Sequence, residues 1–414
     1  MSLKDLLAFT SFKEKLRAHF SLEFIKIGFI NALLLSAFIA FSFFEPVLKE
    51  HFVYLATFGC ACFLLGFALM IFYKPCARSW FYSGFFLGIF WFYWMAYSLV
   101  YFNAPWLIAL EILGIGVIYG IIFALCYFIF NKIFILFTKF IPKNMPFCKF
   151  KAIFLALGLI CTQFIHPFGF NWLNYSLIFI DTPLQSIFIG SPSTASLPFK
   201  VHLNPPQFSQ AHKWDAAKRH EIITAHLKNI DEAIAQNARL VILPETAFAF
   251  LLLSNSNLHN LLLEKSQQIA ILAGAVGFDK NATYNSAFFY DKGAFKRVDK
   301  HILVPFGEQV PLPAFMRDFI NKIFFDSASD FASAPKPGDI EIDGITIRVA
   351  ICYEGTRAEF YATRPQFLAM ISNNAWFYPS SEPALQKLLL KYYARKNQAV
   401  IYHSANGSKS EIIR

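Results

Sequence analysis

The first half of the chain consists of long, nearly uninterrupted apolar runs. Four of them cover Ile27–Phe44, Phe52–Tyr73, Trp80–Phe102 and Trp106–Phe130. Each run has the length that a helix needs to cross about 30 Å of hydrocarbon. We therefore expect four membrane-spanning helices in this part of the chain.

Two weaker apolar stretches follow these four runs. Ala152–Ile165 is short for a span and needs Pro167–Trp172 at the interface to complete a fifth crossing. Tyr175–Gly190 carries Asp181 and Pro183, so we interpret it as interfacial or re-entrant rather than spanning. About five spans and one interfacial segment are thus predicted.

The second half of the chain alternates short apolar runs with amphipathic ones, which is typical of an α/β fold. A continuous apolar run such as 240–243 favours a sheet that is covered on both faces. The expected strands are Phe199–Leu203, Arg239–Leu243, Ile269–Val276, Tyr284–Tyr290, Thr346–Ile351, Phe367–Ile371 and Ala399–His403, and the expected helices are Trp214–Gln236, Leu258–Gln268 and Glu382–Lys396.

These patterns divide the chain into three parts. Residues 1–190 are predicted to form a helical transmembrane domain, and residues 207–414 an α/β domain. The Ser- and Pro-rich residues 191–206 are interpreted as the linker between them.

Composition supports a membrane protein. Hydrophobic residues make up 56% of the 414 residues, with 51 Phe, which is too apolar for an ordinary soluble protein. The net charge is +10, but no Lys/Arg tract interleaved with aromatic residues is present, so we do not expect nucleic-acid binding.

The basic residues alternate between the predicted loops. The first and third loops together hold one Lys or Arg residue, Lys49. The leader, the second loop and the fourth loop hold the others: Lys4, Lys13, Lys15, Arg17, Lys26, Lys74, Arg78, Lys132, Lys139, Lys143, Lys149 and Lys151. This pattern predicts a cytoplasmic N-terminus. Five crossings then place the α/β domain outside the cytoplasm, whereas a further crossing at Tyr175–Gly190 would make it cytoplasmic.

Three segments of the α/β domain carry candidate chemistry: Pro244-Glu245-Thr246, Lys300 before a Pro-Phe-Gly-Glu turn, and Cys352 after an apolar strand. Taken singly, each residue has a structural alternative: Glu245 could cap a helix, Lys300 could be exposed to solvent, and Cys352 could lie in the hydrophobic core. Together they suit acyl transfer, because a thiol near pKa 8.5 needs a base, and a lysine stabilises the oxyanion that forms. No cysteine spacing suggests a disulfide framework or zinc site, so no metal and no cofactor are expected.

These segments resemble the nitrilase superfamily and, more closely, its membrane branch, the apolipoprotein N-acyltransferases. The similar segments cover most of the chain: Gly84–Ser98, Pro167–Ser176, Leu203–Gln207, Lys213–Asp215, Lys300–Pro311, Ala350–Glu354 and Ile371–Phe377. The resemblance implies an αββα sandwich behind the transmembrane helices.

The resemblance also implies roles for particular residues. Glu245 would be the general base, Lys300 the oxyanion stabiliser and Cys352 the nucleophile. Four further residues would support the site or lie beside it: Glu308, Glu354, Tyr353 and Trp376.

The implied reaction moves a fatty acyl chain from a phospholipid, through a thioester on Cys352, to the N-terminal amine of a diacylglyceryl apolipoprotein. The implied location is the bacterial inner membrane, with the catalytic domain in the periplasm. Two rivals are a membrane-anchored amidohydrolase that cleaves a small amide and a catalytically inactive scaffold or receptor. The apolar N-terminal half favours a lipid substrate over the first, and the intact set of three residues argues against the second.

An unusually apolar stretch directly follows Glu245. We expect it to line the path of the acyl chain, and the alternative is that it packs in the core. Its candidate residues are Phe248, Phe250, Leu251, Leu252 and Leu253.

The chain departs from the family's usual pattern in three ways. Asn374 stands where an Asp is usual, and Tyr378 where a Gly is usual, which puts the shape of the substrate loop in doubt. About two spans are missing before the catalytic domain, an even number that leaves the domain on the same side. The chain also ends at Arg414, before the family's last strands and final span, so it is either naturally short or truncated.

Overall fold

The computed structural model describes residues 21–101, 104–138, 147–309 and 331–414. The predictions for Lys4, Lys13, Lys15, Arg17, Lys139, Lys143 and the pair Val310–Pro311 lie outside these residues. The chain divides into two compact units. The first is Met1–Ala96 with Trp106–Pro183, and the second is Tyr97–Pro105 with Leu184–Arg414.

The first unit is helical. Its elements are α2 (Leu22–Ser42), α3 (Glu45–Leu48), η1 (Lys49–His51), α4 (Phe52–Phe72), α5 (Ala77–Phe92), α6 (Ile108–Phe137), α7 (Phe147–Thr162), η5 (Pro167–Gly169) and η6 (Tyr175–Phe179). Two further 3₁₀ segments lie at the junctions of the units: η2 (Tyr93–Val100) and η3 (Pro105–Leu107).

Among the residues that the structure describes, four stretches are long and apolar enough to span a membrane, which confirms the first four predicted helices. They are Leu22–Ser42, Glu45–Phe72, Ala77–Val100 and Pro105–Phe137. The third is not one continuous α-helix, because α5 ends at Phe92 and η2 continues it. With 16 residues, α7 is shorter than a usual span, so the fifth crossing stays a prediction.

Close helix packing in this unit depends on small residues. A Cβ atom on Gly84 of α5 would lie 2.6 Å from the backbone oxygen of Tyr119 on α6. Glycine at this position therefore lets the two helices approach, as small residues commonly do in membranes.

The second unit contains two sheets. Its strands are β1 (Val201–His202), β2 (Leu240–Ile242), β3 (Phe248–Leu251), β4 (Ala270–Asp279), β5 (Ala282–Asp291), β6 (Ala294–Asp299), β7 (Asp339–Ile342), β8 (Ile345–Ile351), β9 (Phe367–Asn373), β10 (Val400–Asn406) and β11 (Glu411–Ile413). The six-stranded sheet has the order β1-β2-β4-β5-β6, with β3 also paired to β4, and the five-stranded sheet has the order β11-β10-β9-β8-β7.

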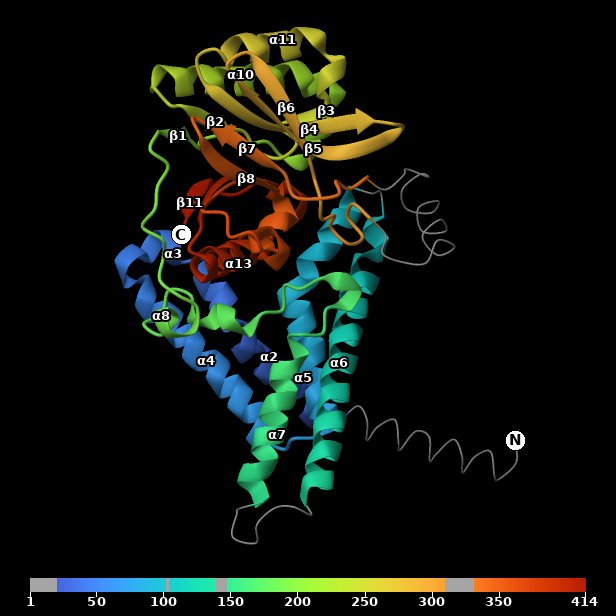
Figure 1. The fold of residues 1–414 in the computed structure, drawn as a ribbon. Coiled ribbons are helices and arrows are strands. Elements are labelled where there is room, and N and C mark those ends of the chain that lie inside the picture. Colours follow the sequence, from blue (N-terminus) through green and yellow to red (C-terminus); the bar gives the residue numbers. More distant parts are fainter. Residues whose placement is uncertain (1–20, 102–103, 139–146, 310–330) are drawn as a thin grey trace, which may run out of the picture. The chain divides into compact units, whose positions relative to one another are not determined.

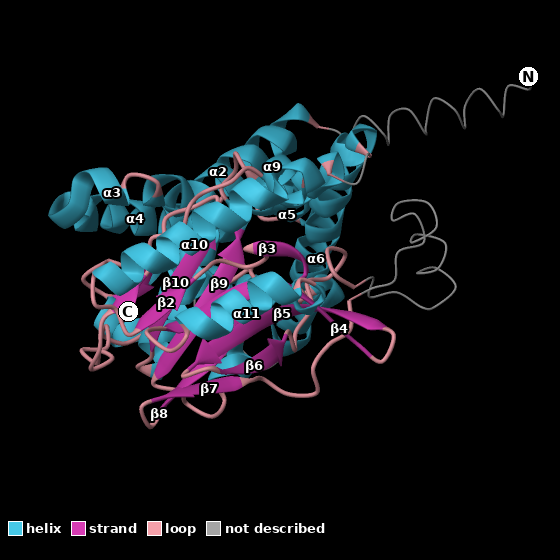
Figure 2. Cartoon of the chain, turned by 90° about the horizontal axis from the view of Figure 1, so that it is seen from above, coloured by secondary structure: helices cyan, strands magenta, loops and turns pink. Residues whose placement is uncertain are grey.

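Helices cover the outer faces of both sheets. The helices of this unit are α8 (Gln185–Phe188), α9 (Gln210–Trp214), α10 (Arg219–Ala235), α11 (Ser256–Lys265) and α13 (Glu382–Asn397), with the 3₁₀ turns η7 (Ala216–Lys218), η8 (Leu252–Ser254), η9 (Cys352–Thr356), η10 (Ala358–Tyr361) and η11 (Asn374–Phe377). Helices α10 and α11 lie side by side over the six-stranded sheet (Figures 1 and 2), and α13 lies on the far side of the five-stranded sheet (Figure 1). This is the predicted αββα sandwich.

All seven predicted strands are present, but β3, β6, β7 and β11 are not among the predictions. The predicted helix Trp214–Gln236 is also wrong at its start. Its first residue, Trp214, ends α9, and Asp215 then leaves the helical conformation. The Asp215 side chain accepts a hydrogen bond from the backbone N–H of Ala217 and begins η7, a local bond that competes with helix continuation.

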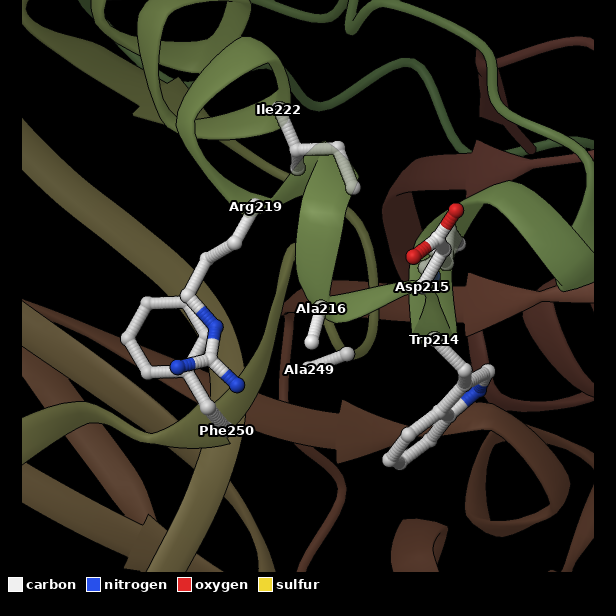
Figure 3. Close-up of a pocket in the computed structure, with 8 residues that line it drawn as sticks. Trp214, Asp215, Ala216, Arg219, Ile222, Ala249 and Phe250 are labelled. Carbon is white, nitrogen blue, oxygen red and sulfur yellow. The ribbon is translucent and has the colours of Figure 1, made fainter.

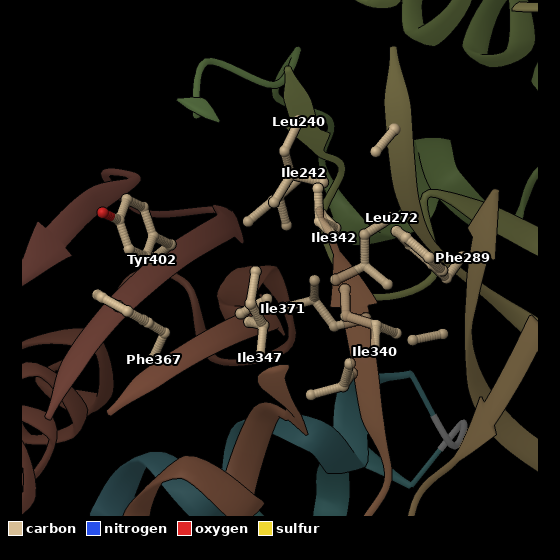
Figure 4. Packing of buried hydrophobic residues seen from close by; sticks show 14 of the residues in the cluster. Leu240, Ile242, Leu272, Phe289, Ile340, Ile342, Ile347, Phe367, Ile371 and Tyr402 are labelled. Carbon is tan, nitrogen blue, oxygen red and sulfur yellow. The ribbon is translucent and has the colours of Figure 1, made fainter. Parts of the chain in front are cut away.

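Two hydrophobic cores hold these layers together. Leu240 and Ile242 point into the core between the sheets, with Leu272, Ile347 and Ile371 (Figure 4). The alternate residues of the same strand belong to the core beneath α10 and α11, together with Ile230 and Leu262. Strand β2 is therefore buried on both faces, as its continuous apolar run predicts.

Truncation of Ile371 tests the inter-sheet core. Because Ile371 is fully buried, Ile371→Ala should leave a cavity and lower the free energy of unfolding of this unit by about 2–5 kcal/mol. Denaturant unfolding in detergent measures the change, with the exposed Lys228→Ala as control. Equal stability of the two variants would contradict this description of the core.

Candidate active site

Cys352 sits on a strained turn at the carboxyl end of β8. The strand ends at Ile351, and Cys352 begins η9 with φ of 54°. A left-handed conformation at a non-glycine residue costs on the order of 1–3 kcal/mol and persists only where the surroundings impose it. The turn projects Cys352 from the end of a buried strand.

Glu354 is the residue that holds this turn. Its Oε2 accepts a hydrogen bond from the backbone N–H of Ile351 at 2.7 Å. Its Oε1 accepts bonds from His301 N at 2.5 Å and Ile302 N at 3.0 Å. Burial raises the pKa of Glu354 to about 7, while Lys300 and these backbone groups act in the opposite direction. Glu354 thereby ties the Cys352 turn to the segment that follows Lys300.

Glu245 lies on a second constrained turn, between β2 and β3. A Cβ on Gly274 would meet Thr246 N at 2.5 Å and Glu245 Cα at 2.6 Å, so only glycine lets the turn pack against β4. Thr246 has φ of 48°, which is rare for a β-branched residue. Lys213 Nζ donates to Glu245 O and to Thr246 Oγ1, both at 2.9 Å. Burial lowers the pKa of Lys213 to about 7, although Glu245 opposes the shift.

Lys300 lies at the centre of a buried ion cluster. Its Nζ lies 2.7 Å from Glu308 Oε2, 2.9 Å from Glu308 Oε1 and 3.7 Å from Glu245 Oε1. The amide of Asn285 donates to Oε1 of both carboxylates, at 2.7 Å each. Burial would lower the pKa of Lys300, but Glu308 and Glu245 together raise it above its ordinary value. The lysine therefore stays charged.

The Cys352 thiol interacts electrostatically with the same cluster. Burial raises the pKa of Cys352 well above its usual range, Glu245 raises it further, and Lys300 lowers it. The resting group is accordingly a thiol, and its reaction with an acyl group requires a base. The structure thus brings a carboxylate, an ammonium and a thiol into one buried site, which suits base-assisted acyl transfer with a cationic oxyanion partner.

Three further predicted site residues lie in the segment after Lys300, in η9 and in η11. Glu308 contacts Lys300 directly and accepts a hydrogen bond from Val304 N at 2.9 Å. Tyr353 is buried, and its hydroxyl accepts a bond from Arg357 at 2.9 Å. Trp376 lies in η11 after β9, with its ring edge-on to Tyr101 at 5.4 Å between centroids.

The apolar stretch after Glu245 divides into two groups. Phe248 and Leu252 are fully buried in the core beneath α10 and α11. Leu251 and Leu253 are 40% and 45% exposed and line an apolar cavity of about 210 Å³ with Phe278. Phe250 is half-buried, so the residues of this stretch that a ligand can reach are Leu251, Leu253 and part of Phe250.

Phe250 belongs to a separate pocket beside α9. The guanidinium of Arg219 lies over the Phe250 ring, 4.8 Å from its centroid, and Trp214 also lines the pocket (Figure 3). Lys213 lines the pocket too and contacts the Glu245 turn. The pocket therefore adjoins the carboxylate side of the site.

Sequence reasoning missed the contributions of Asn285 and Thr246, and assigned no role to Lys213. Asn285 precedes the apolar run 287–290 of β5, and a polar residue in that position is a usable signal. The positive φ of Thr246 leaves no trace in the sequence. Among the described residues, no group of three or more His, Cys, Asp or Glu side chains could hold a metal ion.

Comparison with known proteins assigns the chain to a family. Residues 22–190 match the family model for the apolipoprotein N-acyltransferase integral membrane domain, and residues 205–411 match that for carbon-nitrogen hydrolase. The apolipoprotein N-acyltransferase of Wolinella succinogenes is 38% identical over 410 residues, covering 89% of this chain and 94% of that protein. The chain belongs to the apolipoprotein N-acyltransferase family.

Two other family members and one solved structure complete the comparison. The Campylobacter jejuni enzyme is 32% identical over 94% of this chain and 89% of its own, and the Helicobacter pylori enzyme is 33% identical over 84% and 85%. The structure of XC1258 from Xanthomonas campestris, a CN-hydrolase superfamily protein, covers 51% of this chain and 76% of its own with a TM-score of 0.38 and 17% identity. Family membership therefore depends on the family models and the relatives.

Replacement of Lys300 tests the electrostatics of the site. Because the ammonium opposes the rise in the Cys352 pKa, Lys300→Met should raise that pKa further. The rate of Cys352 alkylation, followed by mass spectrometry across pH, should reach half its maximum at a higher pH than in the unsubstituted protein. An unchanged or lower midpoint would contradict the proximity of Lys300 to the thiol, and Lys228→Ala is the control.

Proposed function

We propose that this protein transfers a fatty acyl chain from a phospholipid to the N-terminal amine of a diacylglyceryl-cysteine apolipoprotein, through a thioester on Cys352. The observation that carries the proposal is the buried Lys300 cluster beside the Cys352 thiol. The cluster occurs in a chain that also has the family's membrane domain, and the membrane would supply the phospholipid donor. Lipoprotein N-acylation is the activity that the names of the relatives state.

In the proposed first half-reaction, the Glu245 carboxylate takes the proton of the Cys352 thiol. The sulfur attacks the ester carbonyl of the phospholipid, and a tetrahedral oxyanion forms. Lys300 has three N–H donors, of which Glu308 uses two, so the third remains for the oxyanion. Collapse breaks the ester C–O bond, and the lysophospholipid leaves with the proton from Glu245.

The proposed second half-reaction uses the same groups with the amine as nucleophile. The amine nitrogen attacks the thioester carbon while Glu245 takes one of its protons. The new oxyanion again faces Lys300, and its collapse breaks the C–S bond. The thiolate then recovers the proton from Glu245, which restores the starting state. One base and one oxyanion partner therefore serve both steps.

Lipid access is proposed to use the accessible apolar residues at the end of β3 and directly after it. Leu251 and Leu253 are exposed and Phe250 is half-buried, whereas Phe248 and Leu252 would support the stretch from the core. The apolar cavity at Leu251 and Leu253 could accommodate part of an acyl chain. For the whole chain, we propose the inner membrane, with the catalytic unit facing the periplasm.

Substitution of the nucleophile tests the reaction. Cys352→Ala should abolish both the acyl adduct and the acylated lipoprotein, because no thioester can form. Cys352→Ser should be very slow, since a hydroxyl is a poorer nucleophile than a thiol at neutral pH. Mass spectrometry of protein and product in one preparation measures both steps, and Cys148→Ala, at an exposed thiol, is the matched control. Full product formation by Cys352→Ala would rule out covalent catalysis.

A reporter fusion tests the orientation. Alkaline phosphatase joined after Lys200 should be active, because the alternating basic loops place the chain outside the cytoplasm at that point. A fusion in the second loop, between Lys74 and Arg78, should be inactive. The reverse pattern of activities would contradict the periplasmic assignment.

A further inference from the structure

Three buried side chains near the site have polar atoms with no hydrogen-bond partner among the described residues. These atoms are Oε2 of Glu382, Oδ1 of Asn374 and Nε2 of Gln386. Each of the three residues is only 1% exposed. Because buried polar groups are nearly always paired, unpaired ones require a ligand, a water molecule or a functional explanation.

The three side chains belong to one cluster. Asn374 Nδ2 donates to Gln386 Oε1 at 3.0 Å. Gln386 lies four residues after Glu382 on α13, so the two share one face of that helix. Two acceptors and one donor are thus left unpaired in adjoining side chains from η11 and α13.

This cluster adjoins the reacting groups. Helix α13 packs against η9, the turn that begins with Cys352, and against η11. Glu382 acts electrostatically on the Cys352 thiol, and Glu245 acts on Glu382. The first turn of α13 therefore lies on the border of the proposed active site.

The chemistry of the cluster identifies the kind of ligand that fits. Burial, and then the charge of Glu245, raises the pKa of Glu382 well above its usual range, which favours the uncharged form of its carboxyl. An ionised carboxylate would stabilise an ammonium ion, which has no lone pair for attack. An uncharged carboxyl accepts an N–H without favouring the ammonium form. The cluster therefore suits a neutral amine.

The third unpaired atom, Nε2 of Gln386, also matches a group of an N-terminal residue. An N-terminal residue presents two amine N–H donors and, three bonds from the amine nitrogen, a carbonyl oxygen. The acceptors Glu382 Oε2 and Asn374 Oδ1 match the two donors, and Gln386 Nε2 matches the carbonyl. The free backbone end of a lipoprotein has this set of groups, whereas the ester group of a phospholipid has no N–H for the two acceptors.

We propose that Glu382, Asn374 and Gln386 form the subsite that binds the N-terminal residue of the acceptor and presents its uncharged amine to the thioester on Cys352. This inference rests on the proposed function and deepens it by naming the residues that recognise the acceptor. The chemistry stays as described for the second half-reaction: the N–C bond forms, the C–S bond breaks, and the amine proton passes through Glu245 to the sulfur.

Binding of two matched probes tests the subsite directly. The probes are a synthetic diacylated lipopeptide with a free N-terminal amine and the same lipopeptide with hydrogen in place of the amine. Without phospholipid, the full-length unsubstituted protein should bind the amine form about tenfold or more tightly, since the other form leaves buried acceptors unpaired. Equal affinity for the two probes would overturn the proposal without any variant.

Two variants assign the effect to Glu382. Glu382→Leu should weaken the preference for the amine form, because only Asn374 Oδ1 remains as an acceptor, and should form the Cys352 thioester at the normal rate and transfer it with an acceptor KM raised about tenfold. Glu382→Gln, which keeps an uncharged acceptor oxygen, should restore the preference for the amine. The matched control is Glu264→Leu, at an exposed glutamate of α11.

The outcomes separate the subsite from the reaction itself. A Glu382→Leu protein that keeps the amine preference and normal transfer would show that the buried oxygen is only hydrated, and would overturn the subsite. Loss of thioester formation in that variant would also overturn it, because Glu382 would then serve the donor step. Absence of any thioester on the unsubstituted chain would instead overturn the proposed function.

Discussion

The buried charge of Lys300 is the interaction on which the rest of the site depends. Its ammonium offsets two carboxylates, Glu308 at 2.7 Å and Glu245 at 3.7 Å, and it opposes the rise in the Cys352 pKa. Removing one partner of a buried ion pair leaves the other charge uncompensated and typically costs about 3–5 kcal/mol. Asn285 donates a hydrogen bond to each of these carboxylates and so links the two acids.

The two turns beside this charge have strained backbone conformations, which the packing of the α/β domain holds in place. Cys352 and Thr246 both have left-handed backbone conformations at the ends of buried strands. Glu354 holds the first turn through three backbone N–H groups. Lys213 and the close approach of Gly274 hold the second. The reactive groups are thereby fixed before substrate arrives, which is the condition for electrostatic catalysis.

Hydrophobic patterning predicted the parts of the structure that depend on burial. The run 240–243 was enough to predict β2, and four apolar runs predicted four helices of spanning length. Strand β6 carries exposed and charged residues, and β11 is only three residues long, so neither has a clear pattern. The family resemblance singled out Glu245, Lys300 and Cys352. It could not reveal Glu382, whose importance depends on an unpaired oxygen that only the folded chain defines.

The central claim is that Cys352 carries the acyl group between donor and acceptor. The most direct test isolates the acylated protein, removes all phospholipid and adds a diacylated lipopeptide with a free amine. The account predicts that the acyl group leaves Cys352 and appears on the lipopeptide amine in equal amount. If the acyl group stays on Cys352 while the complete system still makes product, the thioester is not an intermediate and the account is wrong.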